Sequence, residues 1–158
     1  MPDLPDQVAR LLDGALVGEL TVVADGRPIT YPLIPIFDGE RIYMTSSTLF
    51  SRKLEHIKSN PKVCVSLTDP VAMGGLADRA TIEGDARVIE DDPHGGWERL
   101  LPLWERKEPS IVAFLKARVA FPLFFERVLI EVTPRRTLLW PDGRTDRAPQ
   151  VVELGEVA

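Results

Sequence analysis

The sequence is poor in the residues that make cross-links and metal centres, with one cysteine and two histidines among 158 residues. Cys64 has no second cysteine to pair with and stands between two valines, so we expect a buried, reduced thiol in a cytoplasmic protein. His56 and His94 are far apart and lack the cysteine or carboxylate spacing of a metal site. The sequence therefore predicts no disulfide and no bound metal.

The chain also lacks an excess of basic charge and a long apolar segment. Lysine and arginine total 19 against 24 aspartate and glutamate, a net charge of −5, whereas a nucleic-acid groove needs basic groups that neutralise phosphates. No segment approaches the roughly 20 apolar residues that cross a bilayer, and the first residues lack the basic and apolar regions of a signal peptide. We expect neither nucleic acid nor membrane as a partner, and no secretion.

Several catalytic motifs are missing as well. The sequence has neither Gly-x-Ser-x-Gly nor a glycine-rich phosphate loop, so hydrolase and nucleotide triphosphatase activities have no support. What is present is a hydrophobic content of 44%, which at this length suffices for one domain that folds without cross-links. We expect a single domain over residues 1–158, in which residues 141–158 form a polar tail on the surface.

Short apolar runs separated by tight turns dominate the chain. They predict strands over residues 15–23, 29–37, 41–45, 62–68, 79–90 and 127–132, and residues 136–140 could extend the last strand. Gly84 predicts a bulge in the fifth strand. Helices are expected just before Gly14, over residues 51–59, and as two pieces between residues 92 and 118. The fold class is therefore β-rich α+β, a six-stranded antiparallel split β-barrel with flanking helices.

The second predicted strand contains three prolines, Pro28, Pro32 and Pro35. A proline has no N–H to donate to a neighbouring strand, so these positions predict an unpaired edge or a bulge. A barrel that is split along one seam supplies such an edge. A second subunit or a flat ligand could lie against it.

Hydroxyl and basic side chains gather where the third strand ends and the next helix begins, between Tyr43 and Lys53. A helix N-terminus carries about half a positive charge, so Arg52 and Lys53 in the first turn are each disfavoured by roughly 0.3–1 kcal/mol unless an anion is bound there. A phosphate group would reverse this penalty. Ser51 could cap the helix. The candidate phosphate ligands are Thr45, Ser46, Ser47, Ser51, Arg52 and Lys53. A solvated helix start without a ligand is the alternative interpretation.

At these motifs the sequence resembles the pyridoxamine 5′-phosphate oxidase-like flavin-binding split barrels, over roughly residues 8–134. The resemblance rests on the order of several short segments: Gly26-Arg-Pro, Asp38-Gly, Arg41-Ile-Tyr-Met-Thr, Ser51-Arg-Lys, Asn60-Pro-Lys-Val and Ile82-Glu-Gly-Asp-Ala-Arg-Val-Ile. It implies an FMN-binding oxidoreductase that acts on a small-molecule substrate or electron donor, with the cofactor at the interface of a homodimer. No catalytic side chain is predicted, because the cofactor performs the redox chemistry.

The resemblance also assigns the binding residues. In this family the strand-end hydroxyls and the Arg-Lys pair hold the flavin phosphate, and the second strand runs beside the flavin ring. It therefore implies phosphate contacts for Arg52 and Lys53, and ring contacts for Leu33, Ile34 and Pro35. Two alternatives remain open: a deazaflavin-dependent reductase of the same fold, and a non-catalytic protein that binds flavin or haem.

The segment from Trp140 to Arg147 resembles, imperfectly, the part of the family's oxidase that holds pyridoxamine phosphate. Thr145 stands where that enzyme has histidine, which argues against vitamin B6 oxidation. Trp140 remains a candidate cofactor contact, and a rim position at the barrel end is its alternative. The helical segment 92–125 has no assigned role. Its aromatic residues, and two leucines at helical spacing with them, are expected mostly in the core, and a minority could line the cofactor pocket. These residues are Trp97, Leu100, Leu101, Trp104, Phe114, Phe121, Phe124 and Phe125.

Overall fold

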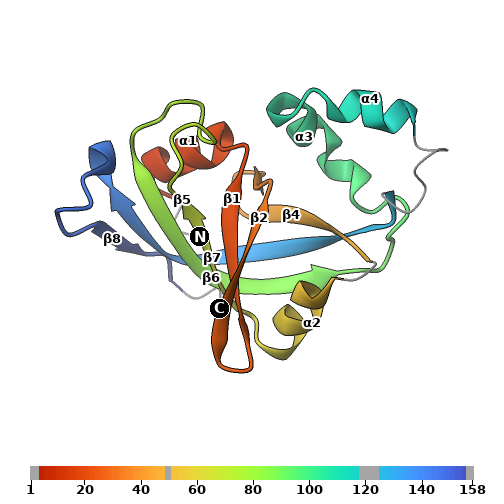
Figure 1. The fold of residues 1–158 in the computed structure, drawn as a ribbon, viewed down its shortest axis with the longest axis horizontal. Helices are drawn as coiled ribbons and strands as arrows, with labels where there is room; N and C mark the ends of the chain where they lie inside the picture. The colour runs from red at the N-terminus through yellow and green to blue at the C-terminus, as the bar shows by residue number, and fades with distance from the viewer. Residues whose placement is uncertain (1–3, 49–50, 118–124, 156–158) are drawn as a thin grey trace.

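Antiparallel strands form one curled sheet in the computed structural model, which describes residues 4–48, 51–117 and 125–155 (Figure 1). The strands are β1 (Gly18–Ala24), β2 (Arg27–Leu33), β3 (Ile36–Phe37), β4 (Ile42–Ser47), β5 (Lys62–Leu67), β6 (Arg79–Ile89), β7 (Arg127–Trp140) and β8 (Gln150–Glu153). Their order is β2-β1-β5-β6-β7-β4-β3, and β8 pairs with β7. The β-rich antiparallel prediction is confirmed.

The helical elements are short and lie around this sheet. They are α1 (Asp6–Gly14), α2 (Arg52–Ser59), a 3-10 turn η1 (Glu98–Leu100), α3 (Leu101–Lys107), α4 (Ile111–Lys116) and a 3-10 turn η3 (Pro141–Gly143). Figure 1 shows α3 and α4 at the upper right of the sheet and α2 below it. No helix in the described ranges has both the length and the apolar character needed to span a membrane.

The predicted count of six strands is wrong for the described chain, which has eight, and the hydrogen-bonded sheet is not closed. The predicted second strand breaks into β2 and β3 at Ile34 and Pro35, because a proline nitrogen cannot continue the ladder. The eighth strand comes from the predicted tail, where Val151 and Val152 are too few to give a strand pattern. All four residues of β8 are exposed, so this segment does lie on the surface.

One segment completes both ends of the sheet. β2 pairs with β1, and β3, which follows after two residues, pairs with β4. The sheet therefore curls until residues 27–37 bridge its two ends, and a seam remains where β2 and the end of β4 have no partner strand among the described residues. Pro28 and Pro32 align with Val23 and Glu19 of β1. Since a proline cannot donate to that ladder, both face the seam, which confirms the predicted unpaired edge.

A bulge shapes the middle of the sheet. The register of β6 against β7 shifts between Glu83 and Gly84, opposite Pro134. A Cβ atom at Gly84 would lie 2.4 Å from the carbonyl oxygen of Thr133, so only glycine fits there without displacing the main chain. The predicted bulge is confirmed, and β7 continues past Pro134 to Trp140 as one strand.

Two hydrophobic cores lie on opposite faces of the sheet. The first fills the inside of the curl and includes the apolar faces of α1 and α2. The second lies between the outer face of β4 and β7 and the helical segment that follows β6. Its larger members are Ile36, Tyr43, Trp97, Leu100, Trp104, Ile111, Phe125 and Leu129.

The helical segment mostly contributes to this second core, as predicted. Trp97 and Trp104 are buried with their rings edge to face, 6.1 Å between centroids. Leu101 is half-buried and Phe114 is exposed. The predictions for Phe121 and Phe124 fall outside the described residues.

Candidate functional site

The end of β4, the start of α2 and the start of β7 meet at one end of the seam. β4 and β7 are antiparallel, and their register places Ser47 opposite Arg127. α2 begins at Arg52, and its apolar residues Leu54 and Ile57 are buried in the first core, which fixes the helix against the sheet. Residues distant in the sequence therefore converge on the position where a phosphate site was expected.

Strand alternation divides the three hydroxyl residues of β4 between two faces. The side chain of Thr45 faces the second core, and its Oγ1 accepts hydrogen bonds from Nε and Nη2 of Arg127 at 3.0 and 2.8 Å. Ser46 faces the other way and is 2% exposed. Its Oγ donates to the Ser47 carbonyl and lies 2.8 Å from Oγ of Ser51. Thr45 is thus placed with Arg127, and Ser46 with Ser51.

The expected side-chain cap at Ser51 is not formed. Ser51 does occupy the N-cap position of α2, but its hydroxyl makes no cap hydrogen bond. The hydroxyl instead bonds Ser46, so it ties the helix start to the end of β4. The prediction was wrong because a neighbouring buried hydroxyl on β4 competes with the helix amides for the Ser51 oxygen.

The two basic residues of α2 lie beside different parts of β2. Arg52 is exposed and lines a shallow hollow with Arg27, Pro28 and His56, below the β1–β2 turn. Lys53 is half-buried, and its Nζ lies 5.3 Å from the ring centroid of Tyr31 on β2. Within the described ranges, neither Arg52 nor Lys53 forms an ion pair. Two cations without carboxylate partners therefore border the seam.

Burial makes the charge of Lys53 costly. Burial lowers the pKa of its ammonium group, and the positive charge of Arg127 lowers this pKa further. Both effects disfavour the charged form of Lys53, and a nearby anion would oppose both.

Arg127 is a residue of this site that the sequence did not reveal. Its guanidinium is half-buried between Thr45 and the ring of Trp104, 5.6 Å from the centroid. Burial lowers its pKa to about 10, although the charge of Glu108 acts in the opposite direction. Arg127 and Thr45 are 82 positions apart, and only the strand register brings them together. No local motif could have indicated this.

The three residues expected beside a flavin ring form the bridge between the sheet ends. Leu33 ends β2 and packs against the first core, whereas Ile34 packs against the second. Pro35 is buried against Gly18, where an added Cβ would lie 3.2 Å from Cγ of the proline. They follow Tyr31 along the seam. The geometry is thus compatible with the expected role, which stays a prediction.

Trp140 does not join this site within one chain. It ends β7, pairs with Arg79, and lies 13 residues along the strand from Arg127. At about 3.3 Å per residue this is roughly 40 Å. The basic side chains that follow do not converge on it, since Arg144 pairs with Asp146 at 2.7 Å in an exposed turn.

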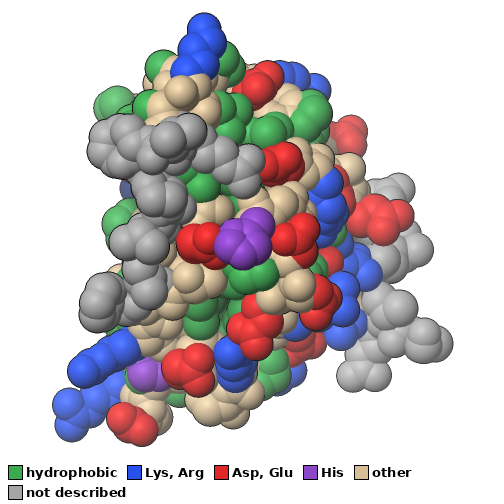
Figure 2. Space-filling view, turned by 90° about the vertical axis from the view of Figure 1, so that its right-hand side faces the viewer, with side chains coloured by type: hydrophobic (Ala, Val, Ile, Leu, Met, Phe, Trp, Pro, Cys, Tyr) green, Lys and Arg blue, Asp and Glu red, His purple; other side chains and the backbone are tan. Residues whose placement is uncertain are grey.

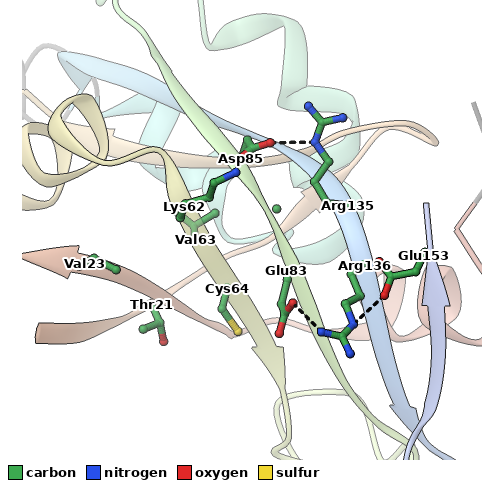
Figure 3. Close-up of a pocket in the computed structure, with 11 residues that line it drawn as sticks. Thr21, Val23, Lys62, Val63, Cys64, Glu83, Asp85, Arg135, Arg136 and Glu153 are labelled. Carbon is green, nitrogen blue, oxygen red and sulfur yellow. Dashed lines mark hydrogen bonds and ion pairs between the residues drawn. The ribbon is translucent and has the colours of Figure 1, made fainter. Parts of the chain in front are cut away.

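A separate hollow of about 440 Å³ lies on the outer face of the sheet beside the bulge (Figure 3). Its charged groups already pair with one another. Lys62 and Arg135 both contact Asp85, at 2.6 and 2.8 Å, and hold the pKa of that carboxyl below its usual value. Arg136 lies 3.0 Å from Glu153. Because its basic groups are paired with carboxylates, this hollow is a poor candidate for an anion-binding site.

Cys64 also lines this hollow, which corrects the prediction of a buried thiol. The side chain is half-buried because it lies on the outer face of β5, whereas its valine neighbours face the core. Burial raises the pKa of the thiol, so the group is a poor nucleophile.

Metal sites and broad charged patches are two further kinds of candidate site. The described residues contain no group of three potential metal ligands. Figure 2 shows a face on which acidic and basic side chains are mixed, without a broad patch of one sign. The end of the seam beside α2 is therefore the strongest candidate site.

Comparisons with known proteins bear on the family and the fold. A family model described as "Pyridoxamine 5'-phosphate oxidase" matches residues 4–141. No curated protein is similar enough to count as a relative.

Several solved structures share the fold. An F420 reductase is 27% identical over 85% of this chain and 98% of its own, with a TM-score of 0.62. A conserved hypothetical protein from Mycobacterium tuberculosis is 21% identical, with coverage of 97% and 92% and a TM-score of 0.67. An FAD-binding protein from Mesorhizobium loti is 18% identical, with coverage of 87% and 94% and a TM-score of 0.59.

Proposed function

Since the chain belongs to the pyridoxamine 5′-phosphate oxidase family, we propose that it is an FMN-binding oxidoreductase whose cofactor lies in the seam between β2 and β4. The proposal rests on one observation above all. Arg52 and Lys53, two cations without an ion pair in the described chain, border this seam at a helix start.

The phosphate end of FMN fits this donor set. A helix N-terminus disfavours each cation in its first turn by about 0.3–1 kcal/mol, and a phosphate dianion makes both contacts favourable. Lys53 also loses hydration and is repelled by Arg127. A bound anion would offset both costs. We assign the phosphate to Arg52 and Lys53, with Thr45 and Ser47 on the neighbouring strand.

The ring end of FMN fits the edge of β2. Pro28, Thr30 and Pro32 turn their main-chain groups towards the seam, so this edge offers three carbonyl oxygens and one N–H, that of Thr30. A flat heterocycle can hydrogen-bond such an edge without competition from a neighbouring strand. Leu33, Ile34 and Pro35 would then line the ring with apolar surface.

We propose that the site is completed in a homodimer. One chain leaves the seam open, and its own Trp140 is roughly 40 Å of strand away from Arg127. Trp140 can contact the cofactor only if it comes from a second copy. On this proposal the dimer both covers the ring and supplies an aromatic wall.

FMN supplies hydride or electron transfer when bound. The chain's own residues bind and orient it: Arg52 and Lys53 fix the phosphate, and the β2 edge fixes the plane of the ring. The second core keeps water from one side of β4 through Trp104 and Tyr43. No described side chain needs to act as an acid or base, and the substrate would be a small molecule that enters along the seam.

A deazaflavin-dependent reductase is the second candidate. The F420 reductase is 27% identical to this chain over nearly its whole length. In addition, Arg127 brings a third cation to the site, which suits a cofactor whose tail carries more negative charge than that of FMN. Both candidates use the same seam and the same cations.

Absorption spectroscopy tests the proposal. The purified protein is titrated with FMN, with the deazaflavin coenzyme F420 and with haem, and a dissociation constant is obtained for each. We expect the lowest constant for FMN. Binding of F420 alone would select the second candidate. Binding of haem alone, or of none of the three, would remove the reason to regard the protein as a flavin enzyme. Reduction of the bound cofactor by NADPH or NADH would then separate an enzyme from a carrier.

A further inference from the structure

We propose that Arg127 is an anion ligand of the seam site and that helix α3 positions its guanidinium through Trp104. This inference deepens the proposed function and rests on it for the identity of the cofactor. It also gives the helical segment after β6 a role, because that segment supplies Trp104.

The first step concerns the position of Arg127. It stands at the start of β7, opposite Ser47 at the end of β4, where α2 begins. Its charge is close enough to Lys53 to lower the pKa of that lysine. Arg127 and Lys53 therefore belong to one electrostatic site although they come from different elements. An anion that contacts Lys53 is within the field of Arg127.

The second step concerns how the guanidinium is held. Nε and Nη2 of Arg127 both donate to the hydroxyl oxygen of Thr45. These two nitrogens form the edge of a guanidinium that binds a carboxylate or phosphate through two parallel hydrogen bonds. An anionic oxygen beside Thr45 would be a stronger acceptor for the same edge, and Thr45 could remain as a further donor to it.

The third step concerns Trp104. Its ring lies under the guanidinium at 5.6 Å and is itself only 3% exposed. Its Nε1 donates to Glu108 at 2.9 Å, and Trp97 packs against it edge to face. The orientation of the indole ring is therefore fixed, and a guanidinium stacked on its face is held in a defined position as well.

The position of α3 is fixed from a distant part of the chain. Lys107, at its end, donates through Nζ to the carbonyl oxygens of Leu12 and Ala15 at the C-terminus of α1. These carbonyls lie at the C-terminal end of a helix that has no basic residue in its last turn, where a cation is favoured. The contact anchors α3, and through Trp104 it fixes the orientation of Arg127.

Two ligands that differ only in phosphate provide the test. FMN and riboflavin are titrated against the wild-type protein and against Arg127→Gln and Arg127→Lys. Loss of one charge-assisted contact should weaken FMN binding roughly 10- to 100-fold and leave riboflavin unchanged. Arg127→Lys should give an intermediate value, because lysine keeps the charge but not the two-point geometry. Arg99→Gln is the matched control, because Arg99 is also an arginine stacked on an aromatic ring: its guanidinium lies 4.7 Å from the ring centroid of Tyr43.

Trp104 is tested by a conservative pair of substitutions. Trp104→Phe keeps an aromatic face and should preserve the ratio of FMN to riboflavin affinity. Trp104→Leu keeps an apolar side chain but removes the face, so it should lower that ratio. A purely structural role of Trp104 would change both affinities together, and that result would overturn its positioning role.

Inorganic phosphate provides a test that does not depend on FMN. At constant ionic strength, phosphate should raise the melting temperature of the wild-type protein above that in chloride, and Arg127→Gln should abolish the increase. If wild type binds no flavin but shows this effect, the proposed function fails and the assignment of Arg127 stands. If FMN binds and Arg127→Gln leaves its preference over riboflavin intact, the assignment of Arg127 is wrong. Wild type that responds to neither phosphate nor FMN refutes both.

Discussion

Removing the two cations of α2 should change stability and binding in opposite directions. Arg52→Ala/Lys53→Ala takes positive charge away from a helix N-terminus, where each cation costs about 0.3–1 kcal/mol. Arg52 is exposed, so its share is at the low end of that range. Lys53 gives up a contact with the ring of Tyr31, worth about 0.5–1 kcal/mol at a partly exposed position, and escapes repulsion by Arg127. Without ligand, the free energy of unfolding should stay level or rise by up to about 1 kcal/mol.

With FMN the sign reverses. Each phosphate contact of a cation contributes roughly 1.5–3 kcal/mol, and the exposure of Arg52 places its contribution at or below the lower figure because solvent screens it. The double variant should therefore lose about 2–4 kcal/mol of binding free energy, or roughly 30- to 1000-fold in affinity. A gain in stability with a loss of binding is the expected signature of a site that is strained without its anion.

Urea denaturation with and without saturating FMN measures both quantities on the same samples. Lys58→Ala is the matched control, because Lys58 is a lysine of the same helix at its opposite end, where it pairs with Glu55 and Glu90. This control should lose a little stability and bind FMN like wild type. An unchanged FMN affinity in the double variant would refute the phosphate assignment. A clear loss of stability without FMN would refute the argument that the cations are strained.

Three further predictions concern the bulge and the hollow beside it. Gly84→Ala should lower the free energy of unfolding by about 2–4 kcal/mol in urea, because its Cβ would meet the Thr133 carbonyl; Gly39→Ala, at positive φ in open space, should cost only about 1 kcal/mol. Ion pairing lowers the folded-state pKa of Asp85, so its contribution to stability is present above the unfolded pKa and lost as pH falls. The difference in melting temperature between wild type and Asp85→Asn should shrink below roughly pH 4, and a constant difference would contradict this. Cys64 should react with Ellman's reagent more slowly at pH 8 than the unfolded chain does, because burial raises its pKa; equal rates would show an accessible thiol.

Sequence patterns predicted the elements whose information is local. The alternation of β5, the glycine bulge of β6 and the start and end of α2 follow from residues within a few positions of each feature. The unpaired edge of β2 followed from its prolines. Each of these depends on steric and hydrogen-bonding rules that act along the chain, so no knowledge of distant partners was needed.

The remaining features depend on which strands are neighbours. Arg127 joins the site only because β4 and β7 pair in a particular register, and a sequence does not state that register. The division of Thr45 and Ser46 between two faces could have been inferred from the period of two, but their partners could not. β8 was missed because its pairing with β7, rather than its own composition, makes it a strand.

The edge of β2 also bears on the tendency of the chain to aggregate. An unpaired strand edge usually invites another chain to extend the sheet, which leads to aggregation. Such an added strand needs donors and acceptors in alternation, and this edge offers acceptors from Pro28 to Pro32 with a single donor at Thr30. A small molecule can bind it, whereas a polypeptide strand cannot pair along its length. The prolines thus let the sheet keep an open side without making that side adhesive.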